Sequence, residues 1–457
     1  MERIRDNKKD DENDLENQPV GTLLWKLALP SILTQMVNMA YNIIDRMFLG
    51  RVENVGSMVL AGLGVTVPLI TIITAFSHLI GCGGAPLAAI EMGKREQKEA
   101  ERILGNCWIL LIMLSIILTM VFLFAGTPML LLVGADEMTL PYAKAYLNIY
   151  VLGTIFVMLS LGLTPFLITQ GFNKISMRNT LIGAGLNILL DPIFIYGFHM
   201  GITGAALATV ISQGVTAFLT IRFLLGAKTR LRIRFDPLDL KLIRRIIGLG
   251  ISLFFMNVTN SLVQTVLYRQ ISLYGNSKYV AALSIMITLD QFVFLPVAGL
   301  GQGAQPIISY SFGAGNISRL KETIKLLIII SNLLAIVGVM IIELIPETLF
   351  RIFTTDLEVI EFGVYGVRIF VIGRAVNGIQ MALQEMFRAI GYAKTAMFNA
   401  TMRKIVLLIP LAMILPSIGG LRYKGIYLAE CLADVLATVS AVIVYLALKK
   451  GIYEHAR

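Results

Sequence analysis

Long apolar runs are the feature that most constrains how this chain can fold. Runs of roughly 20 residues, enough to cross about 30 Å of hydrocarbon as a helix, recur from Trp25 to the C-terminal region. Hydrophobic residues make up 56% of the 457 positions and charged residues 15%, which is not the balance of a soluble domain. Because a backbone in hydrocarbon must close its own hydrogen bonds, we expect an all-α integral membrane protein.

Twelve segments have the length and apolar character of transmembrane helices. They cover residues 25–49, 58–90, 103–125, 140–168, 178–198, 203–225, 243–273, 280–312, 323–345, 361–391, 396–420 and 425–448. The first 20 residues mix charged and amide side chains without an apolar core, so we expect a polar tail and not a cleaved signal peptide.

Cysteine and histidine are too few and too scattered for a disulfide framework, a metal centre or a haem site. None of them has CxxC or other ligand spacing: Cys82, Cys107, Cys431, His78, His199 and His455. We therefore expect no prosthetic cofactor, and metalloenzyme chemistry is set aside on this ground.

The formal net charge of +10 reflects membrane topology and needs no nucleic-acid partner. Basic residues concentrate in the connections that follow even-numbered segments, most densely over residues 228–245, and are few in the others. The positive-inside rule places these connections and both termini in the cytoplasm. We predict a multi-pass protein of the cell inner (plasma) membrane that contacts lipid.

The sequence repeats itself after 220 residues. Glycines and prolines at fixed spacing fall on one another, which similar composition alone does not explain. The matched residues are Gly81, Gly83, Pro86, Gly93, Gly153 and Gly171 with Gly301, Gly303, Pro306, Gly313, Gly373 and Gly391. Each unit holds six spans, an even number, so both units enter the membrane from the same side. The prediction is two parallel six-helix repeats.

The repeat predicts a division of the chain into two lobes. The parts are a cytoplasmic tail 1–20, an N-lobe 21–225, a cytoplasmic linker 226–242, a C-lobe 243–448 and a second tail 449–457. Transporters built this way bind substrate at or beside the repeat interface and alternate access by rocking. Two lobes in one chain need no second subunit, so we expect a monomer that moves a small solute.

Polar residues on two spans of the first half mark a candidate cation site. The first span carries a polar stripe with 3–4–3 spacing, formed by Gln35, Asn38, Asn42 and Asp45. On the fifth span Asn187 and Asp191 share a face, and Pro192 frees a backbone carbonyl one turn earlier. Oxygen ligands suit a hard cation or a proton. Interhelical hydrogen bonding is the alternative interpretation.

The second half does not duplicate these carboxylates. Thr265 stands opposite Asp45, and Leu411 or Leu415 stands opposite Asp191. The polar residues of the second half include Asn257, Asn260, Gln264, Asp290, Gln291, Gln302, Gln305, Arg374, Asn377, Gln380, Gln384, Glu385, Glu430 and Asp434. We expect ion coupling in the first half and substrate contact over both. Bundle cohesion is the alternative role for the second set.

Five stretches, met in this order, resemble the multidrug and toxic compound extrusion (MATE) family over residues 20–450. They are LALPSILTQMVNMAYNIIDRMFLGRV, GGAPLAAIEMGK, GLNILLDPIFIYGF, MGITGAALATVIS and GAQPIISYSFGAG. The resemblance implies an antiporter of organic cations and other amphipathic compounds, driven by H⁺ or Na⁺. It assigns the cation site of the DinF-like branch to Asp45, Asn187, Asp191 and Thr209, with Na⁺ the only metal expected there.

The same resemblance leaves a second cation site unsupported, because the seventh span has amides where another branch carries a glutamate. The expected substrate cleft comprises Gln35, Asn38, Asn42, Asn257, Asn260, Gln264, Arg374, Asn377 and Gln380. Two alternatives stay open: a flippase for lipid-linked saccharides, from a related superfamily, and a membrane-embedded transferase. The flippase predicts a more cationic cleft, and the transferase predicts clustered Asp-rich or His-containing motifs, which the sequence lacks.

Overall fold

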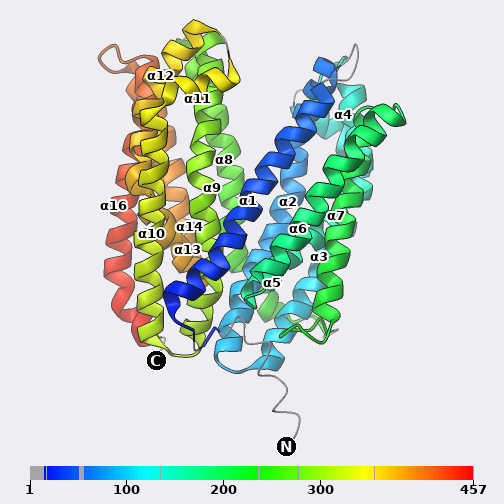
Figure 1. Cartoon of the computed structure of the whole chain (residues 1–457), viewed down its shortest axis with the longest axis vertical. Coiled ribbons are helices and arrows are strands. Elements are labelled where there is room, and N and C mark those ends of the chain that lie inside the picture. Colours follow the sequence, from blue (N-terminus) through cyan, green and yellow to red (C-terminus); the bar gives the residue numbers. More distant parts are fainter. Residues whose placement is uncertain are drawn as a thin grey trace, which may run out of the picture. The chain divides into compact units, whose positions relative to one another are not determined.

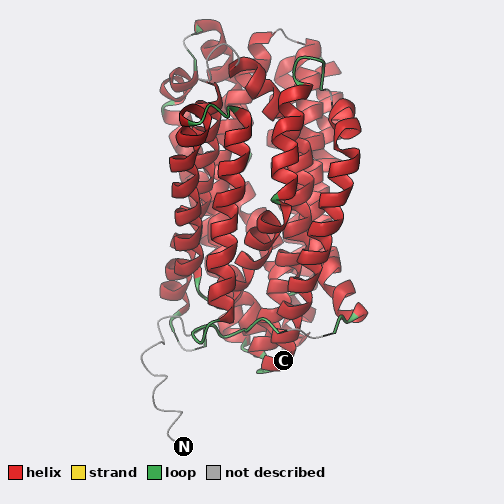
Figure 2. Ribbon diagram, turned by 90° about the vertical axis from the view of Figure 1, so that its right-hand side faces the viewer, coloured by secondary structure: helices red, strands yellow, loops and turns green. Residues whose placement is uncertain are grey.

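The computed structural model describes residues 15–16, 18–50, 56–133, 135–234, 237–274, 277–354 and 356–455, although not every side chain within its helices. Helices and loops account for all of these residues, and they contain no strand (Figures 1 and 2). The all-α fold expected from the apolar runs is confirmed. Long helices form because the backbone satisfies its own hydrogen bonds where the side chains are apolar.

Each of the twelve predicted segments coincides with one helix or with a run of consecutive helices. The first six segments contain α1 (Val20–Gly50), α2 (Gly56–Gly93), α3 (Gln97–Val133), α4 (Leu140–Leu152), α5 (Thr154–Thr169), α6 (Asn173–Pro192), the π-helix η4 (Ile193–Gly197) and α7 (Ile202–Leu225). The last six contain α8 (Leu240–Tyr274), α9 (Ser277–Gly313), α10 (Ile317–Leu344), α12 (Leu357–Ile372), α13 (Arg374–Ala389), α14 (Ala393–Thr401), the π-helix η5 (Met402–Leu408), α15 (Ile409–Ile414), the 3₁₀ helix η6 (Leu415–Ser417) and α16 (Tyr423–His455). A short helix, α11 (Pro346–Phe353), lies in the connection between α10 and α12.

Nine helices in the described part of the chain are long and apolar enough to cross a membrane. The count is ten if α4 and α5, which meet at an angle of 61°, form one broken span. The two remaining predicted segments coincide with α8 and with α12 followed by α13. Charged and amide side chains interrupt the apolar character of α8 and α13.

The breaks in the helices repeat with the same 220-residue period as the sequence. Gly153 ends α4 and Gly373 ends α12, and each is followed directly by the next helix. A Cβ atom on Gly153 would overlap Val210 of α7, and one on Gly373 would overlap the backbone of α16 at Cys431. The two glycines therefore allow equivalent close helix contacts in the two halves, which confirms the repeat.

Contacts divide the chain into two compact units. Unit 1 contains Leu33–Phe254, and unit 2 contains Pro19–Ile32 and Phe255–Arg457. Unit 2 has a buried apolar core to which Leu267, Met286 and Tyr427 contribute from three different helices. These units are defined by contacts, and the lobe boundaries expected from the sequence stay a prediction.

Buried side chains of unit 1 hold the segment between α7 and α8. The Gln170 Oε1 atom accepts hydrogen bonds from the Thr229 hydroxyl and from the N–H groups of Arg230 and Leu231, each at 2.8 Å. On α3, Asn106 Oδ1 accepts from the Asp239 N–H at 3.0 Å. The start of the predicted linker is thus anchored by side chains that are themselves buried.

Candidate functional site

The first polar cluster begins on α6, where Asn187 and Asp191 lie one turn apart and are 3% and 0% exposed. The Asn187 Nδ2 donates to Asp191 Oδ1 over 3.4 Å, a long contact. Asn187 Oδ1 and Asp191 Oδ2 are buried and accept no hydrogen bond from a donor in the described part of the chain. Buried polar atoms normally form hydrogen bonds, so these two oxygen atoms of α6 are available to a hydrogen-bond donor or to a cation.

Asp45 of α1 lies beside Asp191. Its side chain is half-buried, and its carboxyl group lies within hydrogen-bonding reach of the Asp191 carboxyl group. Two ionised carboxylates offer acceptors only, so they repel one another unless a proton or a cation lies between them. A proton or a cation shared by the two groups would relieve this repulsion.

Two further helices border the carboxyl pair. Tyr146 of α4 is buried, lies near Asp45 and forms a side-chain hydrogen bond with Thr209 of α7. The structure thus brings together the four residues predicted from sequence, Asp45, Asn187, Asp191 and Thr209, and adds Tyr146.

An irregular stretch of helix follows the carboxyl pair. Pro192 ends α6, and the next five residues form the π-helix η4. The Tyr196 hydroxyl in η4 donates to the Phe48 carbonyl of α1 over 2.6 Å. The irregular stretch that Pro192 introduces is therefore tied to the helix that carries Asp45, and π-helical turns of this kind are frequent at functional sites.

The other residues of the predicted polar stripe on α1 are Gln35, Asn38 and Asn42. Gln35 and Asn38 are half-buried. The side chain of Asn42 lies outside the described residues, and so does that of Asn257 on α8.

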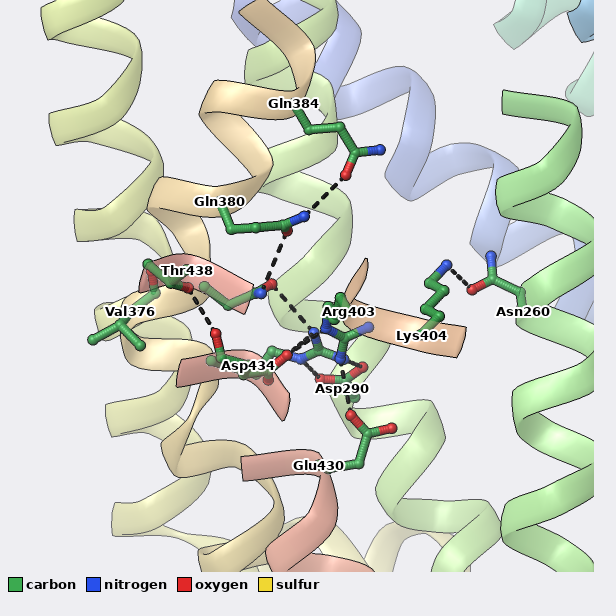
Figure 3. A network of polar contacts seen from close by, with 12 residues as sticks. Asn260, Asp290, Val376, Gln380, Gln384, Arg403, Lys404, Glu430, Asp434 and Thr438 are labelled. Carbon is green, nitrogen blue, oxygen red and sulfur yellow. Dashed lines mark hydrogen bonds and ion pairs between the residues drawn. The ribbon is translucent and has the colours of Figure 1, made fainter. Parts of the chain in front are cut away.

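A second polar cluster lies in unit 2 and is an ion-pair network (Figure 3). Arg374, at the start of α13, makes a two-pronged contact with Asp290 of α9, from Nε to Oδ1 at 2.5 Å and from Nη2 to Oδ2 at 2.6 Å. Its third nitrogen, Nη1, contacts Asp434 Oδ1 of α16 at 3.3 Å. This geometry matches the planar fork of the guanidinium group.

Arg403 of η5 completes the network. Its Nε contacts Asp434 Oδ1 at 2.5 Å, and its Nη2 contacts Glu430 Oε2 at 2.8 Å. Arg403, Glu430 and Asp434 are each less than 9% exposed. Four elements, α9, α13, η5 and α16, are therefore joined through two guanidinium groups and three carboxylates.

Amide side chains continue the network along α13. Arg374 Nη1 donates to Asn377 Oδ1 at 3.3 Å, and Asn377 Nδ2 is 3.5 Å from Gln380 Oε1. Gln380 Nε2 then donates to Gln384 Oε1 at 3.1 Å. These residues follow one another along one face of α13, and they bond to one another.

Two residues of this region, Arg403 and Lys404, are not among the candidates predicted from the sequence. The available signal is a pair of basic residues in the middle of the apolar segment 396–420. Lys404 donates a hydrogen bond to Asn260 of α8 (Figure 3). Gln264, one turn further on α8, has an exposed side chain.

Ligand sets for transition metals do not occur in the described ranges. No group of three or more His, Cys, Asp or Glu side chains there could hold a metal ion. The chemistry of the first cluster, two carboxylates and an amide oxygen, fits a proton or a hard monovalent cation better than a soft metal.

The chain is similar to known proteins in both sequence and structure. The MatE family model matches residues 30–193 and 252–414, one stretch in each repeat. Multidrug export protein MepA of Staphylococcus aureus (strain MRSA252) is 28% identical over 434 residues, covering 94% of this chain and 95% of MepA. MepA of Staphylococcus haemolyticus (strain JCSC1435) is 26% identical over 436 residues, covering 95% of each chain. An outward-facing structure of a multidrug resistance MATE family transporter of the MOP superfamily has a TM-score of 0.89 at 21% identity, covering 95% of this chain and 98% of that one.

Proposed function

Because this chain belongs to the MatE family of membrane transporters, we propose that it is a cation-coupled antiporter that exports organic cations or other amphipathic, drug-like compounds. Like its multidrug export relatives, it is a transporter and not an enzyme. The observation that carries the coupling proposal is the approach of the Asp45 and Asp191 carboxyl groups within unit 1. We place the protein in the cell inner membrane with both termini in the cytoplasm.

Coupling between the ion and the exported compound follows from the positive charge that the carboxyl pair binds. With a proton or Na⁺ bound, Asp45 and Asp191 attract the shared charge, and without it they repel one another. The two states therefore favour different distances between α1 and α6. Tyr196 on η4 bonds to the α1 backbone at Phe48, so a change at the pair is transmitted to the irregular end of α6.

Exchange of ion for compound requires only that the two ligands prefer different states. An ion that binds the outward state more tightly shifts the population toward it by its differential affinity, and the exported compound is released there. Ion binding and compound binding then exclude one another through the conformational equilibrium, and no prosthetic cofactor takes part.

The test is transport of a fluorescent cationic dye by the purified protein in liposomes. A pH gradient and a sodium gradient are imposed separately, and the gradient that drives dye movement identifies the coupling ion. Asp45→Asn and Asp191→Asn remove one charge each at nearly constant volume, so gradient-driven export should fall at least about tenfold. Glu137→Gln, an exposed carboxylate between α3 and α4, is the matched control.

Dye export at the wild-type rate in both asparagine variants would contradict the proposal. Thermal unfolding of each variant in detergent separates loss of coupling from loss of folding. The saccharide flippase gains no support from Arg374 and Arg403, since both are already paired with carboxylates.

A further inference from the structure

Lys404 is a cationic side chain near the middle of a membrane-spanning segment. It is the twelfth residue of the apolar stretch Ala393–Ser417, so roughly 15 Å of helix separates it from either end. A lysine arm cannot reach the interface over that distance. Because an unpaired lysine at this depth is unfavourable in free energy, its retention points to a partner or a function.

The carboxylates of the region are already engaged by other cations. Asp290 is held by Arg374, Glu430 by Arg403, and Asp434 by both. Among the residues that the structure describes, Lys404 makes no ion pair. Its hydrogen bond goes instead to a neutral amide, Asn260 Oδ1 on α8.

The direction of the side chain separates Lys404 from the network. Arg403 and Lys404 are adjacent in η5 and point in different directions, so Arg403 enters the carboxylate cluster while Lys404 points toward α8 (Figure 3). On α8 the side chains of Asn260 and Gln264 are both exposed and one turn apart. When Asn260 Oδ1 accepts from Lys404, its amide nitrogen keeps two N–H donors for another group.

We propose that Lys404, Asn260 and Gln264 form a subsite for a carboxylate or similar anionic group on an exported amphipathic compound, an inference that rests on the proposed export function. An ammonium group flanked by amide N–H donors matches the acceptors of a carboxylate and repels an organic cation. The subsite specifies, among the amphipathic compounds of the proposed function, those that carry an anionic group.

A competing role for Lys404 is charge neutralisation. Three carboxylates against two guanidinium groups leave one negative charge, which the neighbouring ammonium offsets at longer range. In that case the loss of Lys404 impairs every substrate equally. A subsite role impairs only those compounds that carry the anionic group.

The experiment compares a free-acid rhodamine with its methyl ester, which share a fluorophore and differ only in the carboxylate. Initial export rates of both are measured in proteoliposomes for wild type, Lys404→Gln, Lys404→Arg and the control Lys450→Gln, which removes an exposed lysine at the end of α16. Lys404→Gln should lower the acid-to-ester rate ratio at least about tenfold, the effect of losing one charge-assisted contact. Lys404→Arg and Lys450→Gln should keep the ratio.

Two results would overturn the subsite. A parallel loss of acid and ester export in Lys404→Gln would assign Lys404 to charge neutralisation. A ratio change that occurs in liposomes containing anionic lipid, and disappears in purely zwitterionic lipid, would assign the discrimination between acid and ester to the charge of the membrane surface. Gradient-driven ester export by wild type tests the antiporter proposal separately, so failure of one is distinguishable from failure of the other.

Discussion

Two buried aspartates show how the partner of a carboxylate sets its role. Asp191 lies beside a second carboxyl group, that of Asp45. Asp434 lies between two guanidinium groups, so its counter-charge is supplied by the chain itself. The same side chain is therefore part of a carboxyl pair in unit 1 and of an ion-pair network in unit 2.

Removing one arginine of the network should be strongly destabilising. Arg403→Ala leaves Glu430 and part of Asp434 without a counter-charge in a buried position, which costs about 3–5 kcal/mol of unfolding free energy. Thermal unfolding in detergent measures the effect. The control is Arg351→Ala, because the Arg351–Glu347 pair is exposed and contributes less than about 1 kcal/mol. Equal shifts for the two variants would contradict a cohesive role.

At the scale of helices, the ends of α5 and α13 are built alike. Gly171 and Gly391 follow these helices with φ of 85° and 80°, a conformation that favours glycine. In each case the next residue's N–H bonds to a carbonyl five residues earlier, as in Phe172 to Leu167 and Tyr392 to Phe387. The same turn thus recurs 220 residues apart.

Alanine at either turn glycine should destabilise the protein through backbone strain. Gly171→Ala and Gly391→Ala force an L residue into the left-handed region, at about 1–2 kcal/mol each. The comparison is Gly64→Ala in α2, where an added Cβ meets nothing within 4 Å and helix propensity improves. Melting temperatures should fall for the first two variants and hold or rise for the third.

The connection between α7 and α8 gives a second prediction at this scale. Gln170→Ala removes the acceptor for two backbone N–H groups and one hydroxyl, so the connection should detach more often from unit 1. Trypsin should then cleave faster at Arg230 or Arg232. Electrophoresis of the fragments measures the rate of cleavage. Gln213→Ala on α7 is the control, and unchanged cleavage in Gln170→Ala would show that other contacts hold the segment.

For the whole molecule, duplication of the scaffold did not duplicate its charges. The 220-residue shift places Thr154 opposite Arg374, Ile70 opposite Asp290, and Gly183 opposite Arg403. Likewise, no carboxylate stands at the positions of the second half that are equivalent to Asp45 and Asp191. Each half has therefore kept the helix breaks and acquired its own polar chemistry.

Topology is the property of the whole chain that the basic connections predict. In a variant without its three native cysteines, Glu347→Cys should react with a membrane-impermeant maleimide on intact cells, because α11 follows an odd-numbered span. Lys450→Cys should react only after the cells are opened. The reverse pattern would invert the orientation.

Residue order by itself determined the class of fold, the helical segments, the repeat and three members of the first cluster, Asp45, Asn187 and Asp191. These follow from local rules: apolar length, the periodicity of a helix, and glycine or proline at fixed spacing. Tertiary structure alone decided which charges meet. Arg374 pairs with Asp290 across 84 positions, and Arg403 and Lys404 are adjacent in sequence yet bind different helices. Such pairings depend on which helix faces pack together, and no local pattern specifies that.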